Sequence, residues 1–152
     1  MEIICTNKKA YYNYDIEETL EAGICLLGSE VKSLREKRGN INGAFGRIEN
    51  GECFLYNSHI DQYPQGISYD EKRKRKLLLH KYQIKRLEGK LQEKRMVLVP
   101  IRLYFKNGKV KVELGIGRGK RLVDKREEIK KKEINREIQR TLKSIKSNFS
   151  LP

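Results

Sequence analysis

The sequence is poor in the residues that build disulfide frameworks, metal knuckles and large aromatic cores. It has no tryptophan and only three cysteines, Cys5, Cys25 and Cys53, which lie far apart. An odd number of cysteines without a Cys-x-x-Cys pair excludes a disulfide framework and a zinc knuckle. We therefore expect free thiols in a reducing compartment.

Long apolar runs are also missing. No stretch of about 18 apolar residues occurs, and MEIICTNKKAYYNY at the start has no apolar segment of the kind that directs secretion. These absences predict a cytoplasmic protein without a membrane partner. With 152 residues, of which 38% are hydrophobic, the chain can form one modest core with an appendage.

Motifs of catalysis and cofactor binding are likewise absent from the sequence. GIGRGKR (115–121) has the wrong spacing for a phosphate-binding loop and lacks the third glycine of a dinucleotide fingerprint. His59 and His80 have no triad or His-x-x-His partner at a suitable spacing, so a structural or surface role is the better interpretation. We therefore predict no catalytic residue, no metal site, no cofactor and no enzymatic activity.

Positive charge is the feature present in excess. The chain carries 34 Lys and Arg against 20 Asp and Glu, a net charge of +14. Such an excess opposes compaction and is typical of proteins that bind a polyanion. Residues 118–152 alone hold 12 Lys and Arg against 5 Asp and Glu. We expect a folded domain at 1–117 and a basic C-terminal tail at 118–152.

The pattern of residues 1–117 predicts a small antiparallel β-barrel. Asn50-Gly51 and Asn107-Gly108 each separate two runs of alternating apolar residues, which is the signature of a β-hairpin. Between the hairpins, Ile84, Leu87 and Leu91 have the spacing of an amphipathic helix. Strands, one helix and further strands follow the order of an oligonucleotide-binding (OB) barrel. We therefore expect a mainly β fold with flanking helices, built on an OB-like closed antiparallel barrel.

Two shorter segments are also expected to be helical. Val31 and Leu34 are spaced as on one face of a short helix. The carboxylates of Glu17, Glu18 and Glu21 are typical of a helix with a charged first turn, and no environment in the sequence distinguishes two of them as a catalytic pair.

The tail contains a single narrow apolar stripe. Asp124 and Glu127 fit an N-cap residue and its capping-box partner. A helix of this kind is marginal unless its stripe packs against something. The stripe is formed by Ile134, Ile138, Leu142, Ile145 and Phe149.

The densest cluster of cations, residues 73–76, directly precedes three leucines, residues 77–79. The leucines cannot share one face of a strand, so two are expected in the core and one near the surface. The cations then lie on the rim of a rigid element, where a phosphate backbone can meet them. A solvated charge run is the alternative.

Four segments form specific motifs: GSEVKSLR (28–35), RKLLLHK (75–81), KVKVELGIGRGKR (109–121) and DKREE (124–128). Taken together, they resemble the SsrA-binding protein family over about residues 7–140. The resemblance implies an OB-like barrel that binds the tRNA-like domain of transfer-messenger RNA (tmRNA), one-to-one as a monomer, and delivers it to stalled ribosomes. It also implies a tail that is unstructured in free solution and becomes a helix in the empty mRNA channel, beside the decoding centre of the small subunit.

The resemblance assigns Glu21, Leu78, His80 and Lys111 to the RNA-contacting surface. With the basic run included, the expected RNA-binding residues are Glu21, Arg73, Arg75, Lys76, Leu78, His80 and Lys111. The expected ribosome-contacting residues of the tail are Lys120, Arg121, Asp124, Lys125, Arg126, Lys130, Lys131 and Lys132. Val123 stands where the family usually has an aromatic residue or His, and an aliphatic side chain cannot stack on a base in the same manner.

Two other functions fit the same composition. A structural ribosomal protein of OB type, with a basic extension along rRNA, would be bound to every ribosome. A general single-strand binder would show no preference for a tRNA-like fold. Competition of tmRNA against tRNA and unstructured RNA separates these functions from the first.

Overall fold

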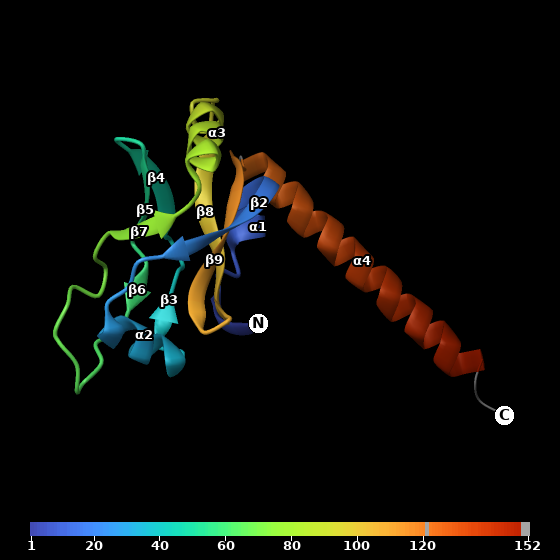
Figure 1. Cartoon of the computed structure of the whole chain (residues 1–152). Coiled ribbons are helices and arrows are strands. Elements are labelled where there is room, and N and C mark those ends of the chain that lie inside the picture. The colour runs from blue at the N-terminus through green and yellow to red at the C-terminus, as the bar shows by residue number, and fades with distance from the viewer. Residues whose placement is uncertain (121, 150–152) are drawn as a thin grey trace. The chain divides into compact units, whose positions relative to one another are not determined.

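The computed structural model describes residues 1–120 and 122–149 (Figure 1). The chain forms two compact units, Met1–Gly119 and Lys120–Pro152. The first unit contains helices α1 (Ala10–Asn13), α2 (Gly28–Arg35) and α3 (Lys81–Leu91), and the second contains α4 (Leu122–Phe149). The strands are β1 (Glu2–Thr6), β2 (Tyr14–Ile24), β3 (Gly39–Asn40), β4 (Phe45–Glu49), β5 (Glu52–Tyr56), β6 (His59–Ile60), β7 (Arg75–Leu78), β8 (Met96–Lys106) and β9 (Lys109–Gly119).

The strands of the first unit form an antiparallel sheet that closes on itself. Neighbouring strands follow the order β8-β4-β5-β7-β2-β9, and β9 pairs again with β8, which completes a ring. Strand β1 joins the other edge of β8, while β3 and β6 form a separate two-stranded sheet beside α2 (Figure 1). The predicted mainly β fold with an OB-like barrel is confirmed. Strand β9 extends to Gly119, so residues 118 and 119 belong to the sheet.

Both Asn-Gly pairs form the tight turns of β-hairpins, as predicted. Asn50 and Gly51, between β4 and β5, have φ values of 51° and 76°. Asn107 and Gly108, between β8 and β9, have φ values of 52° and 75°. Two consecutive positive φ values are the requirement of the type I′ turn, whose twist matches that of the flanking strands. These turns fix the pairing register of each hairpin, and the register decides which residues of its strands face inward.

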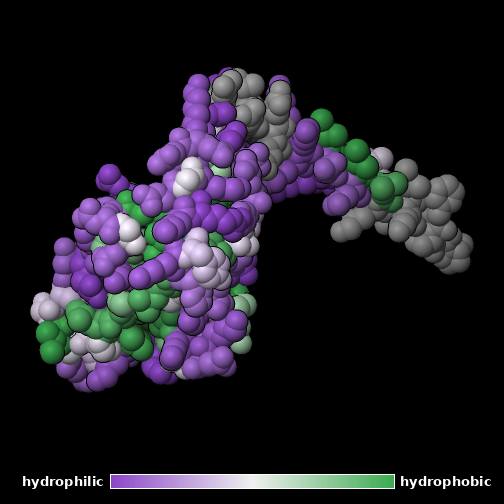
Figure 2. Space-filling view, turned by 45° about the horizontal axis from the view of Figure 1, so that its top comes forward, coloured by the Kyte–Doolittle hydropathy of each residue, from purple (hydrophilic) through white to green (hydrophobic). Residues whose placement is uncertain are grey.

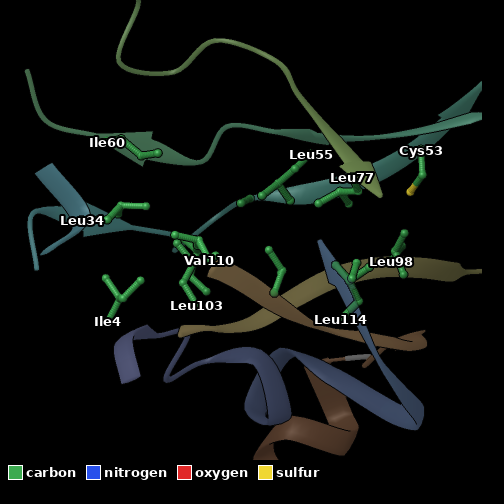
Figure 3. Close-up of a cluster of buried hydrophobic side chains, with 14 of the residues drawn as sticks. Ile4, Leu34, Cys53, Leu55, Ile60, Leu77, Leu98, Leu103, Val110 and Leu114 are labelled. Atoms are coloured by element: carbon green, nitrogen blue, oxygen red, sulfur yellow. The ribbon is translucent and has the colours of Figure 1, made fainter. Parts of the chain in front are cut away.

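The interior of the ring is a single hydrophobic core (Figure 3). Leu55 on β5, Leu77 on β7, Leu98 on β8 and Leu114 on β9 are all almost fully buried. Successive side chains of a strand point to opposite faces, so each strand presents its alternate residues to this core and the others to the outer surface. Functional side chains on the outer face therefore stand on a backbone that the core holds rigid.

Residues 17–21 belong to strand β2, and the helix predicted from Glu17, Glu18 and Glu21 is wrong. Strand β2 pairs with β9 from Tyr14 to Gly23. These ladder pairings outweigh the small intrinsic preference of glutamate for helix, because β propensity depends mainly on packing context. The predicted helices at Val31–Leu34 and Ile84–Leu91 are confirmed as α2 and α3.

The second unit is a long helix. Helix α4 begins at Leu122, so Asp124 lies inside the helix and is not its N-cap. Residues 122–149 contain no glycine or proline. The segment therefore has a high intrinsic helix propensity, which does not depend on a bound RNA. Ile134, Ile138 and Leu142 are exposed, and Figure 2 shows hydrophobic residues at the surface of the described part of this helix. The side chains of Ile145 and Phe149 lie outside the described residues.

The tail has the helical backbone that the resemblance implied for it in the mRNA channel. That the tail is unstructured in free solution stays a prediction. None of the helices among the described residues is both long and apolar enough to cross a membrane.

Candidate nucleic-acid interface

An open groove of about 730 Å³ crosses the outer face of the barrel. Strands β2, β7 and β9, the β4–β5 turn and the start of α3 border it. Five of the seven expected RNA-binding residues line this groove, although the first and last of them are far apart in the sequence. The five are Glu21, Lys76, Leu78, His80 and Lys111.

Leu78 places an exposed apolar side chain in the groove. Leu77 is 1% exposed and Leu78 is 52% exposed, while Leu79 is partly buried against the core. The prediction that two of the three leucines enter the core and one lies near the surface is confirmed. Leu78 on β7 pairs with Gly23 on the neighbouring strand β2. A Cβ added at Gly23 would lie 3.2 Å from the Cβ of Leu78. The absence of a side chain at Gly23 therefore makes room for the leucine.

Glu21 is held in place by residues of β8. The hydroxyl of Tyr104 donates to Oε2 of Glu21 at 2.5 Å, and Nζ of Lys106 donates to the same oxygen at 3.3 Å. The bond from Tyr104 is the largest cause of the lowered pKa of Glu21, and Lys106 and Lys111 lower it further against the opposing effect of burial. Burial and the bond to Glu21 raise the pKa of Tyr104. Glu21 is thus an ionised acceptor that RNA hydroxyl or amino groups can meet.

Lysines supply the positive charge of the groove. Lys76, Lys81 and Lys111 all line it. Nζ of Lys76 lies 3.3 Å from Oε1 of Glu52, a surface contact that a phosphate can replace at little cost, because exposed ion pairs contribute only about 0–1 kcal/mol. Lys111 lies close enough to Glu21 to lower its pKa. The groove therefore combines phosphate-binding cations with the carboxylates of Glu21 and Glu52.

His80 and Tyr82 form a stacked pair of rings at the start of α3. Their centroids are 5.5 Å apart and their planes differ by 10°. The backbone N–H of His80 donates to Oε1 of Gln83 at 3.0 Å, which fixes the start of the helix. Tyr82 is exposed and was missed by sequence reasoning, because periodicity identifies the buried face of a helix and gives no signal for an outward ring. Exposed rings of this kind can stack on unpaired bases.

Arg75 is buried, so its prediction as an RNA-binding residue is wrong. Its Nε donates to Oε2 of Glu30 at 2.8 Å, and its Nη1 donates to the carbonyl and hydroxyl oxygens of Ser58 at 2.8 and 2.9 Å. Arg73 is partly buried and binds the same carboxylate, with Nε 3.1 Å from Oε2 of Glu30. The alternation of β7 turns Arg75 and Leu77 inward together. Half of the basic run therefore serves the fold.

Lys74 and Lys76 are the two cations of the run that face outward. Nζ of Lys74 lies 4.2 Å from the ring centroid of Phe54 and 3.4 Å from Oε2 of Glu49. The rim position predicted for all four cations thus holds for these two, and only Lys76 of the pair lines the groove.

The expected ribosome-contacting residues lie in the second unit. Arg126 is exposed on α4, and so are the consecutive lysines 130–132, which a helix directs to different sides because each residue turns by about 100°. Arg121 lies outside the described residues. The backbones of Asp124 and Lys125 belong to α4, but their side chains lie outside the described set, as does that of Val123. The contacts proposed for this unit, including Lys120, stay predictions.

A closed OB-like barrel with an exposed groove of lysines, an exposed leucine and stacked rings defines an RNA-binding protein of the OB class. The particular family follows from comparison with known proteins: the chain belongs to the SmpB protein family, which matches residues 4–144.

Individual relatives support the same assignment. The SsrA-binding protein of Syntrophobacter fumaroxidans is 54% identical over 143 residues, covering 93% of this chain and 89% of that protein. The SsrA-binding protein of Pelobacter propionicus is 52% identical, covering 94% of this chain and 95% of that protein. A solved structure described as "tmRNA-SmpB: a journey to the center of the bacterial ribosome" aligns with a TM-score of 0.66 at 47% identity, covering 78% of this chain and 85% of that chain.

Proposed function

We propose that this protein binds the tRNA-like domain of SsrA RNA (tmRNA) and delivers that RNA to stalled ribosomes, so that the nascent chain is tagged in trans-translation. The observation that carries the proposal is the groove, which gathers Glu21, Lys76, Leu78, His80 and Lys111 on one rigid face. Membership of the SmpB protein family and the relatives that bind SsrA RNA by name support it. The protein works in the cytoplasm, where ribosomes are, as a non-enzymatic adaptor.

The groove suits a folded RNA whose bases are partly exposed. Lysines bind phosphates, the ionised Glu21 accepts hydrogen bonds from ribose hydroxyls or base amino groups, and Leu78 contacts an apolar face of a base or sugar. The His80–Tyr82 pair offers a ring for stacking. Because the core holds every one of these groups on a strand or a helix start, the protein recognises the shape of the RNA with little loss of its own conformational entropy.

The second unit has a separate role. Its exposed cations are attracted to the rRNA phosphates of the decoding centre and the mRNA channel of the small subunit. The stripe of Ile134, Ile138 and Leu142 remains exposed on α4 and buries itself only where a vacant channel accepts the helix. Barrel and tail thus divide RNA binding and ribosome sensing, with one protein per RNA.

A competition experiment tests the proposal. The full-length protein is titrated against labelled tRNA-like domain of tmRNA, with unlabelled tmRNA, elongator tRNA or unstructured RNA as competitors. The expected result is displacement by tmRNA at far lower concentration than by unstructured RNA. Equal displacement by all three would indicate a general single-strand binder, and stoichiometric sedimentation with every ribosome in the absence of tmRNA would indicate a structural ribosomal protein.

A further inference from the structure

Three side chains with metal-binding atoms converge at the end of β6. Nε2 of His59 lies 2.7 Å from Oδ1 of Asp61 and 3.0 Å from Oε2 of Glu71. One ligand atom from each of the three residues lies within 4.8 Å of the other two. All three side chains are partly exposed, so an ion from solution can reach them. No residue of this cluster lines the groove described above.

The backbone fixes two of these residues. His59 pairs with Asn40 of β3 in the small sheet. The N–H of Asp61 donates to the carbonyl of Arg38 at 3.0 Å, and the carbonyl of Asp61 accepts from Oγ of Ser33 at 2.7 Å. His59 and Asp61 therefore lie on either side of Ile60, the last residue of β6, at a separation that the backbone fixes.

Glu71 reaches the same point from the long connection 61–74 that precedes β7. Its carbonyl accepts from the N–H of Ile60 and from Nη2 of Arg75, both at 3.0 Å. Arg75 is itself locked by its buried pair with Glu30. The third ligand is thus held by the same network that buries half of the basic run.

The donor atoms of the cluster are of types that zinc binds. An imidazole nitrogen with two carboxylate oxygens is a combination that Zn²⁺ accepts, and three protein ligands leave a position for water. Ligand atoms about 2.1 Å from a tetrahedral zinc lie roughly 3.4 Å apart. The present separations of 2.7 and 3.0 Å therefore have to widen by about 0.7 and 0.4 Å to admit the ion.

We propose that His59, Asp61 and Glu71 bind a divalent transition metal ion, Zn²⁺ foremost, which fastens the connection 61–74 to β6. Two carboxylates facing one imidazole leave local negative charge. Arg38 offsets this charge only in part, because its Nε lies 3.6 Å from Oδ2 of Asp61. His59 also borders a hollow of about 550 Å³ with Asn40 and Lys72, which gives the ion an entry path. Sequence spacing excluded a metal because the ligands at 59, 61 and 71 match no helical or knuckle pattern.

Calorimetric titration of the full-length protein with ZnCl₂ tests this site, with Mn²⁺ and Mg²⁺ as comparison ions. We expect one Zn²⁺ per chain and much weaker binding of Mg²⁺, which takes oxygen ligands. Glu71→Gln and His59→Gln should each lower the zinc affinity at least tenfold. His80→Gln and Cys25→Ser are matched controls, because they remove the other histidine and an exposed thiol and should leave the affinity unchanged.

Thermal unfolding provides the second measurement. Zn²⁺ should raise the Tm of the unmodified protein and of Cys25→Ser, but not of Glu71→Gln, provided circular dichroism finds each variant folded. Absence of stoichiometric zinc binding, or binding that survives Glu71→Gln and disappears in Cys25→Ser, would overturn the proposal. The triad would then be an internal ion pair of the histidine with its two carboxylates.

Discussion

Glu30 and Arg75 form an ion pair in which both side chains are completely shielded from solvent. Nη2 of Arg75 lies 2.5 Å from Oε2 of Glu30, and Arg73 binds the other oxygen of the same carboxylate. Burial acts to raise the pKa of Glu30, but hydrogen bonds from Arg73, the N–H of Leu27 and Arg75 more than offset it, so that the pKa is lowered. This pair joins α2 to β7 and sets the position of the strand that carries Leu78.

Glu30→Gln should destabilise the fold strongly. Removal of one partner leaves Arg75 buried without a counter-charge, which costs about 3–5 kcal/mol of unfolding free energy. Urea denaturation at neutral pH measures the change. Glu36→Gln is the control, because Glu36 makes an exposed contact of 3.7 Å with Arg38 and should cost about 0–1 kcal/mol. Equal denaturation midpoints for the two variants would contradict the structural role of the buried pair.

Substitution of the adjacent residues Leu77 and Leu78 should affect two different properties, stability for Leu77 and RNA binding for Leu78. Leu77→Ala removes a core side chain and should cost about 2–5 kcal/mol of stability. Leu78→Ala should change stability by less than about 0.5 kcal/mol and weaken tmRNA binding about tenfold, equivalent to ~1.4 kcal/mol. Gel-shift titration and urea denaturation of both variants measure the two effects. Unchanged RNA affinity in Leu78→Ala would remove this residue from the interface.

Tyr104→Phe should raise the pKa of Glu21 toward the ordinary range of a carboxyl group. The lost hydroxyl is the largest cause of the lowered pKa, and Lys106→Met should produce a smaller rise. Because the folded-state pKa is depressed, the stabilisation from Glu21 is complete above the unfolded pKa and is lost as the pH falls through the folded one. NMR titration of the Glu21 carboxyl carbon follows both variants. A larger shift in Lys106→Met would reverse the assigned order of causes.

Deletion of residues 120–152 should leave binding of the tRNA-like domain nearly intact and abolish nascent-chain tagging. The groove lies entirely within residues 1–119, which form a compact unit. Gel shift measures the first property, and translation of a truncated message with tmRNA measures the second. Near-equal loss of both in the deletion would show that the tail takes part in binding the RNA.

Local patterns predicted those parts of the fold whose cause is local. The two Asn-Gly turns need only their own φ values, and the spacing of Ile84, Leu87 and Leu91 identifies a buried helix face. The glutamates of β2 led to the wrong prediction of a helix. The partners that make residues 17–21 a strand lie almost a hundred positions away in β9. The sequence of a strand therefore says little about its hydrogen-bonded pairing with a distant strand.

The sequence by itself determined the hairpins, the excess of positive charge, and the family motifs that identify an RNA-binding barrel with a basic tail. Only the tertiary structure decided which cations of residues 73–76 reach solvent, that Leu78 lies opposite Gly23, and that Glu21, His80 and Lys111 share one groove. The physical reason is that exposure depends on the direction a side chain takes from a closed sheet. That direction follows from strand register between distant segments, which no short stretch of sequence contains.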